Sequence, residues 1–355
     1  MLANSTEPEA QPVRVGVVGQ GYWGRKLAAR YRQISEALLV GVCDHDAAAL
    51  ARASAEHAHV PAYARLDDLL RHKPDLVVVA TEPRAHMPVA RAALEAGCAV
   101  FVEKPLATSV ADADRLAALG ARVGRPVLGS ALWSWDPVVG ALAGLVAEGR
   151  IGRLLRIEGA RQNLGCLKPG HDVLDDLLPH DLQILRRMMS SPPVQVQAWG
   201  SRLAGTSALD AATVRLVWSD ATEAELRLSW VSPEKVRRMV VVGTEGMAVF
   251  EPLDVAAPLR VHRSRPTDAA RAEPGALADV WAPPLPRDGV EPLLAQCLET
   301  LHCVRGAAPS VPLSLHREVT AVVEAARRSA DQHGAPIRVA PSTDHTAQSL
   351  GGPTE

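Results

Sequence analysis

The feature that most constrains the fold is a glycine-rich turn near the N-terminus. An apolar, β-branched run, 13–18, leads directly into Gly19-Gln-Gly21-Tyr-Trp-Gly24, and helical spacing begins near Tyr22. A strand that passes through GxGxxG into a helix is typical of a dinucleotide-binding βαβ unit. In such a unit Gly19 allows the tight turn, Gly21 lets the backbone approach a pyrophosphate, and Gly24 allows close helix packing.

An acidic residue follows at the expected distance. Asp44 lies twenty residues after Gly24, at the end of a second predicted strand, where a carboxylate can bind the adenosine ribose. A carboxylate at this position repels a 2′-phosphate, so the sequence favours NAD over NADP, although His45 beside it weakens this preference. The cofactor contacts predicted from this part of the chain are Gly19, Gly21, Tyr22, Trp23, Gly24 and Asp44.

Residues 12–132 are predicted to form an α/β domain, a doubly wound Rossmann sheet. Short β-branched runs alternate with Ala- and Leu-rich segments, which is typical of a parallel sheet covered by helices. The predicted strands are 13–18, 38–43, 76–80, 98–102 and 126–130, and the predicted helices are 22–33, 46–56, 65–71 and 86–96.

Residues 133–340 are predicted to form an α+β domain for substrate binding and oligomerisation. Hairpin-like spacing of its strands indicates a large, mostly antiparallel open sheet. The predicted strands are 153–161, 194–200, 212–218, 223–230, 236–242 and 246–250, and the predicted helices are 137–148, 176–189, 291–304 and 317–333. Residues 251–290 are predicted as loop that can include one strand. We expect Val196, Leu216 and Leu228 on the uncovered face of the sheet, which predicts a homodimer or homotetramer.

Composition narrows the classes of partner. The formal net charge of -2 provides no basic surface for nucleic acid or an anionic membrane. The five cysteines form no CxxC pair, and the His and Cys spacing predicts no metal site, so we expect reduced thiols in a cytoplasmic protein. No apolar run approaches the roughly 18 residues of a membrane span, and no signal peptide is recognisable. The polar segments 1–11 and 341–355 are predicted to be disordered.

Reactive residues are expected just beyond the carboxyl ends of the parallel strands. Lys104, one of only five lysines, follows the strand at 98–102, where a cation can stabilise a developing alkoxide beside a nicotinamide. His86 either borders the nicotinamide or has a structural role at the start of a helix. The cofactor contacts predicted from these strand ends are Thr81, Pro83, His86, Glu103 and Lys104.

Together the motifs resemble the glucose-fructose oxidoreductase, inositol dehydrogenase and MocA family. The matching stretches are Gly19 to Gly24, Thr81-Glu-Pro-x-x-His86, Glu103-Lys104-Pro105, Trp135-Asp-Pro137, Gly149-x-Ile-Gly152, Asp176-Leu-Leu-Pro-His180 and Glu291-Pro-Leu. The resemblance implies an NAD-dependent oxidoreductase that transfers a hydride between nicotinamide C4 and a secondary alcohol. The implied substrate is a sugar, a cyclitol, or a nucleotide or amino sugar.

The same resemblance implies the catalytic residues. Lys104 would lie near the nicotinamide and the substrate hydroxyl, His180 would accept or donate the proton, and Asp176 would contact substrate or complete the proton network. Gln183 stands where some members have an aspartate, so inositol specificity does not transfer directly.

Two helix geometries are compatible with Asp176 and His180. They share a helix face if the helix begins before Asp176, because their spacing is i, i+4. If Pro179 instead marks the first turn, His180 lies at the positive end of the helix dipole, which favours a neutral imidazole.

Further substrate contacts are expected where the second domain begins. Trp133 and Trp135 either wall a sugar pocket or pack in the core. Arg161 either contacts phosphate or hydroxyl groups or is a solvated edge-strand residue. The full set of predicted substrate contacts is Trp133, Arg161, Asn163, Asp176 and His180.

Two other functions fit the same sequence. Reduction of an imine or enone needs a proton donor but no contacts to sugar hydroxyls. A regulator that senses NAD without turnover needs the glycine-rich turn but not Lys104 or His180.

Overall fold

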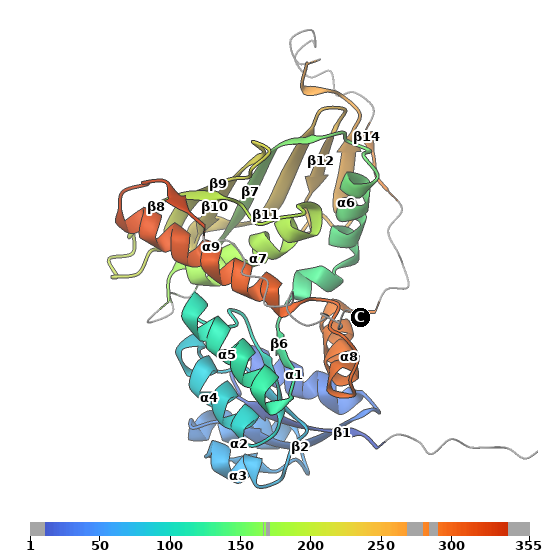
Figure 1. Cartoon of the computed structure of the whole chain (residues 1–355), viewed down its shortest axis with the longest axis vertical. Helices are drawn as coiled ribbons and strands as arrows, with labels where there is room; N and C mark the ends of the chain where they lie inside the picture. The colour runs from blue at the N-terminus through green and yellow to red at the C-terminus, as the bar shows by residue number, and fades with distance from the viewer. Residues whose placement is uncertain (1–10, 166, 168–170, 268–279, 284–289, 340–355) are drawn as a thin grey trace, which may run out of the picture.

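The computed structural model describes residues 11–165, 167, 171–267, 280–283 and 290–339. Two sheets lie one above the other, the first domain at the bottom of Figure 1 and the second at the top. Apart from Gln11, the segments predicted to be disordered lie outside the described residues. Within the described part of the chain, no helix has the length and apolar character needed to cross a membrane.

The first domain is the predicted doubly wound sheet, with six parallel strands in the order β3-β2-β1-β4-β5-β6. The strands are β1 (Val13–Val18), β2 (Ala37–Cys43), β3 (Ala62–Tyr63), β4 (Leu76–Val79), β5 (Ala99–Val102) and β6 (Val127–Gly129). The helices are α1 (Tyr22–Gln33), α2 (Ala47–Glu56), α3 (Leu66–Leu70), α4 (Pro83–Glu95) and α5 (Val110–Val123). Strands β4 and β5 are buried along their whole length, as expected for a sheet covered on both faces.

The prediction omits two elements of this domain, β3 and α5. Strand β3 has only two residues, too few for a periodic pattern. Helix α5 carries recognisable end signals: the Ser109 hydroxyl accepts a hydrogen bond from the Asp112 amide, and Gly124 ends the helix with φ +65°. Helix α4 begins at Pro83 rather than at residue 86, because proline is favoured in the first helical turn.

The second domain is built on nine strands in the order β14-β13-β12-β11-β7-β10-β9-β8-β15, antiparallel except for β7 with β10. The strands are β7 (Leu154–Leu164), β8 (Gln195–Ser201), β9 (Ala211–Val217), β10 (Glu223–Ser229), β11 (Val231–Gly243), β12 (Met247–Phe250), β13 (Leu259–His262), β14 (Val280–Trp281) and β15 (Ile337–Arg338). The helices are η1 (Leu132–Trp135), α6 (Pro137–Ala147), α7 (Val173–Met188), α8 (Pro292–Val304) and α9 (Leu313–Asp331). Helices α7 and α9 cover one face of this sheet (Figure 1).

The prediction of an apolar, uncovered sheet face for subunit contacts is wrong. Val196, Leu216 and Leu228 are fully buried in the core that α7 and α9 close. The opposite, open face carries charged side chains in ion pairs, among them Arg156, whose Nε lies 2.8 Å from Glu158 Oε1 and whose Nη2 lies 3.0 Å from Glu225 Oε2. The alternation along the strands therefore holds, but its apolar side points inward.

Helix α8 packs on the first domain although it follows the second domain in sequence. Leu293, Cys297 and Leu301 share one core with Tyr31 and Phe101. The predicted division at residue 133 is therefore a boundary in sequence, and 291–304 belongs to the first domain by its packing.

Candidate active site

The glycine-rich turn forms a cradle that fits a dinucleotide. Gly19 has φ +90°, and an added Cβ there would lie 2.5 Å from the Ala80 carbonyl oxygen. At Gly24 an added Cβ would lie 1.7 Å from the Gly19 carbonyl oxygen, so only glycine permits this strand–helix contact. Gly21 has no protein atom within 4 Å of such a Cβ. It borders a pocket of about 580 Å³, which leaves its backbone open to a ligand.

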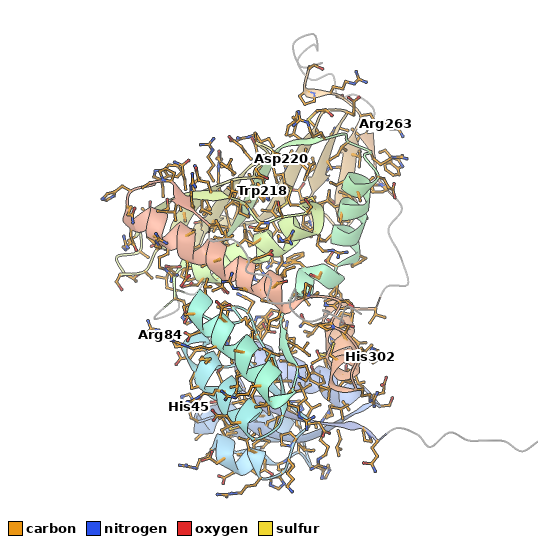
Figure 2. All side chains as sticks on the ribbon, viewed as in Figure 1. His45, Arg84, Trp218, Asp220, Arg263 and His302 are labelled. Atoms are coloured by element: carbon orange, nitrogen blue, oxygen red, sulfur yellow. The ribbon has the colours of Figure 1, made fainter. Side chains whose placement is uncertain are left out.

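Asp44 is held in place at the far end of the same pocket. Its Oδ2 accepts a hydrogen bond from the Gln20 amide at 2.6 Å, and its Oδ1 accepts one from the Asp46 amide at 2.9 Å. His45 also lines this pocket but is fully solvent-exposed, and it projects from the first domain in Figure 2. The fixed carboxylate is thus available to ribose hydroxyls at the position where the sequence predicts them.

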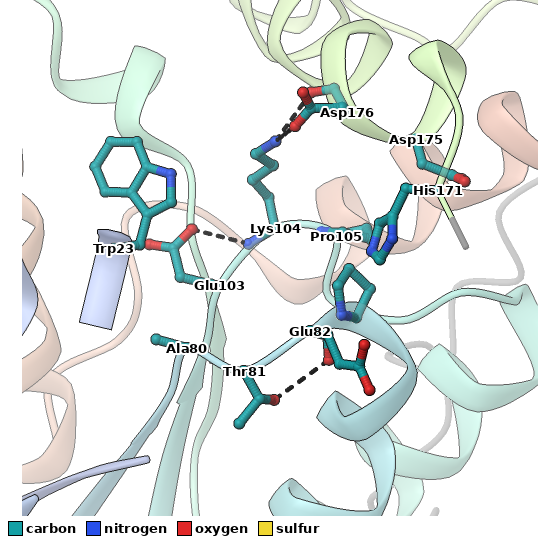
Figure 3. Close-up of a pocket in the computed structure, with 11 residues that line it drawn as sticks. Trp23, Ala80, Thr81, Glu82, Glu103, Lys104, Pro105, His171, Asp175 and Asp176 are labelled. Carbon is teal, nitrogen blue, oxygen red and sulfur yellow. Dashed lines mark hydrogen bonds and ion pairs between the residues drawn. The ribbon is translucent and has the colours of Figure 1, made fainter. Parts of the chain in front are cut away.

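A second pocket of about 330 Å³ continues from the dinucleotide pocket toward the second domain (Figure 3). The two pockets share Trp23, Ala80, Thr81 and Glu82. The residues that line only the second pocket are Pro83, Glu103, Lys104, Pro105, His171, Asp175 and Asp176. The prediction missed His171, which precedes α7 and carries no motif of its own.

Lys104 and Asp176 meet in this second pocket, from opposite domains. The Lys104 Nζ donates to Asp176 Oδ1 at 2.8 Å and to the Asp176 carbonyl oxygen at 2.9 Å. The other carboxylate oxygen accepts a hydrogen bond from the Trp230 indole at 3.2 Å. Both charged side chains are more than four-fifths buried, so their position is well defined. The ammonium lies beside the end of the dinucleotide pocket, where it can stabilise negative charge on a substrate oxygen.

The course of α7 decides between the two helix geometries. The helix begins at Val173 and its N-cap is Asp172, so Asp176 and His180 share a face and His180 is far from the positive helix end. The alternative that placed Pro179 in the first turn is wrong. Pro179 has no amide to bond the carbonyl of Asp175, which disturbs the helix ladder beside the carbonyl that Lys104 binds.

His180 is neutral and its tautomer is fixed by Trp133. The indole Nε1 donates to His180 Nδ1 at 3.1 Å, and because an indole nitrogen only donates, Nδ1 carries no proton. The remaining ring proton of the neutral imidazole is therefore on Nε2. Burial lowers the pKa of His180 well below its ordinary value, and the charges of Lys104 and Arg161 lower it further.

Glu103 and His86 support the site from behind. Glu103 is buried, its Oε2 accepts the Lys104 amide at 3.1 Å, and burial raises the pKa of its carboxyl group. His86 is fully buried, with Nδ1 2.8 Å from the Pro105 oxygen and Nε2 3.1 Å from the Thr81 oxygen. It lines neither pocket and ties the two motif-bearing strand ends together; its contact with the cofactor stays a prediction.

Arg161 is buried in the middle of the nine-stranded sheet, so its interpretation as a solvated edge residue is wrong. Its Nε and Nη2 donate to Asp181 Oδ1 at 2.9 and 2.7 Å, and its guanidinium lies 5.0 Å from the centre of a Trp133 ring. Asn163, on the same strand, is half-exposed and borders neither of the two pockets. Gln183 is buried and donates to the Ser130 carbonyl oxygen at 2.9 Å, which gives it a structural role between the domains.

No group of three or more His, Cys, Asp or Glu side chains in the described ranges is arranged to hold a metal ion. Trp135 lies apart from the reactive groups, at a small cavity of about 20 Å³ beside α8. Of the two tryptophans that the sequence singles out, Trp133 is the one in contact with His180.

Comparison with known proteins identifies the family. Residues 13–129 match the model of an oxidoreductase family with an NAD-binding Rossmann fold, the glucose-fructose oxidoreductase, inositol dehydrogenase and MocA family. Residues 139–249 match the C-terminal domain of the same family. The chain belongs to this family, and its N-terminal domain is an NAD-binding domain.

Relatives and solved structures agree with this assignment. UDP-N-acetylglucosamine 3-dehydrogenase from Acidithiobacillus ferrooxidans is 34% identical over 230 residues, which is 64% of this chain and 70% of that protein. A putative UDP-kanosamine synthase oxidoreductase subunit from Amycolatopsis mediterranei is 32% identical over 266 residues, 66% of this chain and 73% of that one. The structure of the Acidithiobacillus ferrooxidans enzyme has a TM-score of 0.77 at 25% identity, covering 91% of this chain and 99% of the other.

Proposed function

We propose that the protein is an NAD-dependent dehydrogenase that oxidises a secondary alcohol of a sugar, cyclitol, or nucleotide or amino sugar. The observation that carries the proposal is the ion pair between Lys104 and Asp176, in a pocket continuous with the dinucleotide pocket. His180, one helical turn beyond Asp176, lines a small adjoining cavity that also includes Glu103 and Lys104. NAD, when bound, supplies the hydride acceptor.

Lys104 is proposed to orient the substrate hydroxyl and to stabilise negative charge on its oxygen. Asp176 holds the ammonium by its carboxylate and by its backbone carbonyl, so the charge stays at the pocket wall. The Trp230 indole fixes the second carboxylate oxygen and thereby the whole pair. These contacts preorganise the cation before substrate arrives.

His180 is proposed to take the proton of the substrate hydroxyl, and Trp133 controls when it can do so. While the indole bond persists, Nδ1 has no free lone pair and Nε2 already bears a proton. Neither nitrogen can act as a base in that state. Release of the Trp133 bond on substrate binding frees one nitrogen, and the lowered pKa keeps that nitrogen unprotonated at neutral pH.

A homodimer or homotetramer remains part of the proposal, with a different surface from the one expected. The open face of the nine-stranded sheet carries cross-strand ion pairs, such as Arg156 with Glu225 at 3.0 Å and Arg215 with Glu223 at 2.5 Å. A contact through this face would rest on charge complementarity, so the molar mass measured by light scattering should fall as salt is raised. A monomer at low salt would contradict the proposal.

The test is a screen of the purified protein for NADH formation with cyclitols, free sugars, sugar phosphates and nucleotide sugars, in parallel with His180→Asn. We expect turnover with at least one polyol and a loss of about 100-fold or more in the variant. If every polyol fails and an imine is reduced instead, the substrate assignment is wrong. If neither class is turned over while NADH still binds, the protein is a sensor.

A further inference from the structure

Arg237 is a half-buried cation beside the candidate active site, on the strand next to Arg161. Its guanidinium makes no hydrogen bond and no ion pair with the described residues, although the side chain is half-buried. Its charge acts on both His180 and Tyr22, so it is within electrostatic reach of the catalytic residues and of the start of α1. Burial lowers the pKa of its guanidinium, and the positive charge of Arg161 lowers it further. A half-buried arginine without a partner is costly for the folded protein.

The sheet register places two arginines directly opposite each other. Arg237 on β11 pairs with Arg161 on β7, and such cross-strand neighbours point to the same face with their Cβ atoms about 5 Å apart. Like charges at directly opposite positions destabilise a sheet. Asp181 accepts two hydrogen bonds from Arg161 and none from Arg237, so it attracts Arg237 only through space.

Further cations surround the same cleft. Lys235 and Arg237 both act on Tyr22, and Lys26 donates to the Tyr22 hydroxyl at 2.8 Å. Lys104 lines the second pocket, and Lys26 and Lys235 act on Tyr22 at the dinucleotide pocket, so three of the five lysines act on these two pockets. The protein as a whole carries a formal net charge of -2, so this concentration of positive charge is local.

We infer that Arg237 binds a phosphate ester on the substrate, which makes the substrate a phosphorylated sugar and not a neutral polyol. This inference rests on the proposed function and narrows its substrate class. A guanidinium can form two parallel hydrogen bonds to phosphate oxygens, and that contact relieves both the desolvation of Arg237 and its repulsion by Arg161. A sugar 1-phosphate and a nucleoside diphosphate sugar share this chemistry, because each carries a phosphate on the anomeric oxygen.

The experiment compares Arg237→Gln with Arg238→Gln in the holoenzyme. Arg238 is the matched control, because it is the next residue of β11, points to the open face, and is exposed. The substrates are UDP-N-acetylglucosamine, N-acetylglucosamine 1-phosphate and the neutral methyl N-acetylglucosaminide. We expect the wild type to prefer a phosphorylated sugar, and Arg237→Gln to raise its KM at least tenfold with a smaller change in kcat. Comparable turnover of the neutral glycoside would overturn the inference.

Binding of UDP to the enzyme–NADH complex, measured by calorimetry, tests the site without turnover. Arg237→Gln should weaken UDP binding at least tenfold and flatten its salt dependence, Arg237→Lys should restore part of it, and Arg238→Gln should leave it unchanged. The Tm of Arg237→Gln should equal or exceed that of the wild type, because the like-charge contact is gone. Equal UDP affinity in the two glutamine variants would overturn the inference. If no sugar is oxidised, but Arg237→Gln weakens UDP binding and Arg238→Gln does not, the proposed function is wrong and the phosphate site at Arg237 is supported.

Discussion

Two alanine substitutions in the glycine-rich turn separate folding of the first domain from cofactor binding. At Gly24 an added Cβ would lie 1.7 Å from the Gly19 carbonyl oxygen, so α1 must move by about 1.3 Å to reach the 3.0 Å that real Cβ atoms keep. Such overpacking typically costs about 1–3 kcal/mol. At about 2–4 °C per kcal/mol, we expect the Tm of Gly24→Ala to fall by roughly 2–12 °C.

Gly21→Ala should behave in the opposite way. No protein atom lies within 4 Å of the added Cβ, and φ of -73° is accessible to alanine. The free energy of unfolding should therefore change by less than about 1 kcal/mol. The same Cβ faces the dinucleotide pocket, so NADH affinity should fall at least tenfold, about 1.4 kcal/mol or more.

The assay pairs thermal unfolding with a fluorescence titration of NADH on each purified variant. The account requires Gly24→Ala to lose stability and Gly21→Ala to lose NADH binding at nearly unchanged Tm. If Gly21→Ala binds NADH as the wild type does, the pocket beside Gly21 does not hold the pyrophosphate and the reasoning is refuted.

Three further predictions follow from the same contacts. Burial lowers the pKa of His316 from 6.5 to about 4, so the free energy of unfolding should fall by about 3 kcal/mol as the pH falls from 6.5 to 4. In urea titrations His316→Gln should lose less stability over this pH range, and an equal loss would refute the prediction. Asp44→Asn should raise kcat/KM for NADP relative to NAD by at least about tenfold, because the substitution removes a fixed negative charge. An unchanged ratio would count against the contact between Asp44 and the ribose. Trp133→Phe removes the hydrogen bond that favours an unprotonated Nδ1, so the pKa of His180 should rise and the acid limb of the pH profile of kcat/KM should move to higher pH. An acid limb at the same pH would show that the indole does not control the protonation of this histidine.

Much of the first domain can be predicted from the sequence because its signals are local. The strand, the glycine-rich turn and Asp44 act within a few tens of residues, and the structure has them as expected. Strand β3 is too short to carry a pattern, whereas α5 does have a cap at Ser109 and a terminal glycine at Gly124 that identify it in retrospect.

The features that the sequence does not reveal depend on contacts between distant segments. Which face of the nine-stranded sheet is covered depends on where α7 and α9 pack, so alternation alone placed Leu216 on the wrong side. The hydrogen bond from Trp133 to His180 joins residues 47 positions apart in the sequence, and no rule of residue spacing predicts it. The pairing of Arg237 with Arg161 requires the register of β11 on β7, which no local pattern in either strand gives.

The central claim is that Lys104, although predicted to touch the cofactor as well, contributes mainly to the chemical step, and Lys104→Met tests it most directly. With the best substrate of the screen, we expect kcat to fall by roughly 100- to 1000-fold while the NADH dissociation constant changes by less than about threefold. Steady-state measurement of NADH formation, alongside the NADH titration, gives both values. Turnover within about tenfold of the wild type would contradict the account, because the ammonium held by Asp176 would then have no part in the reaction.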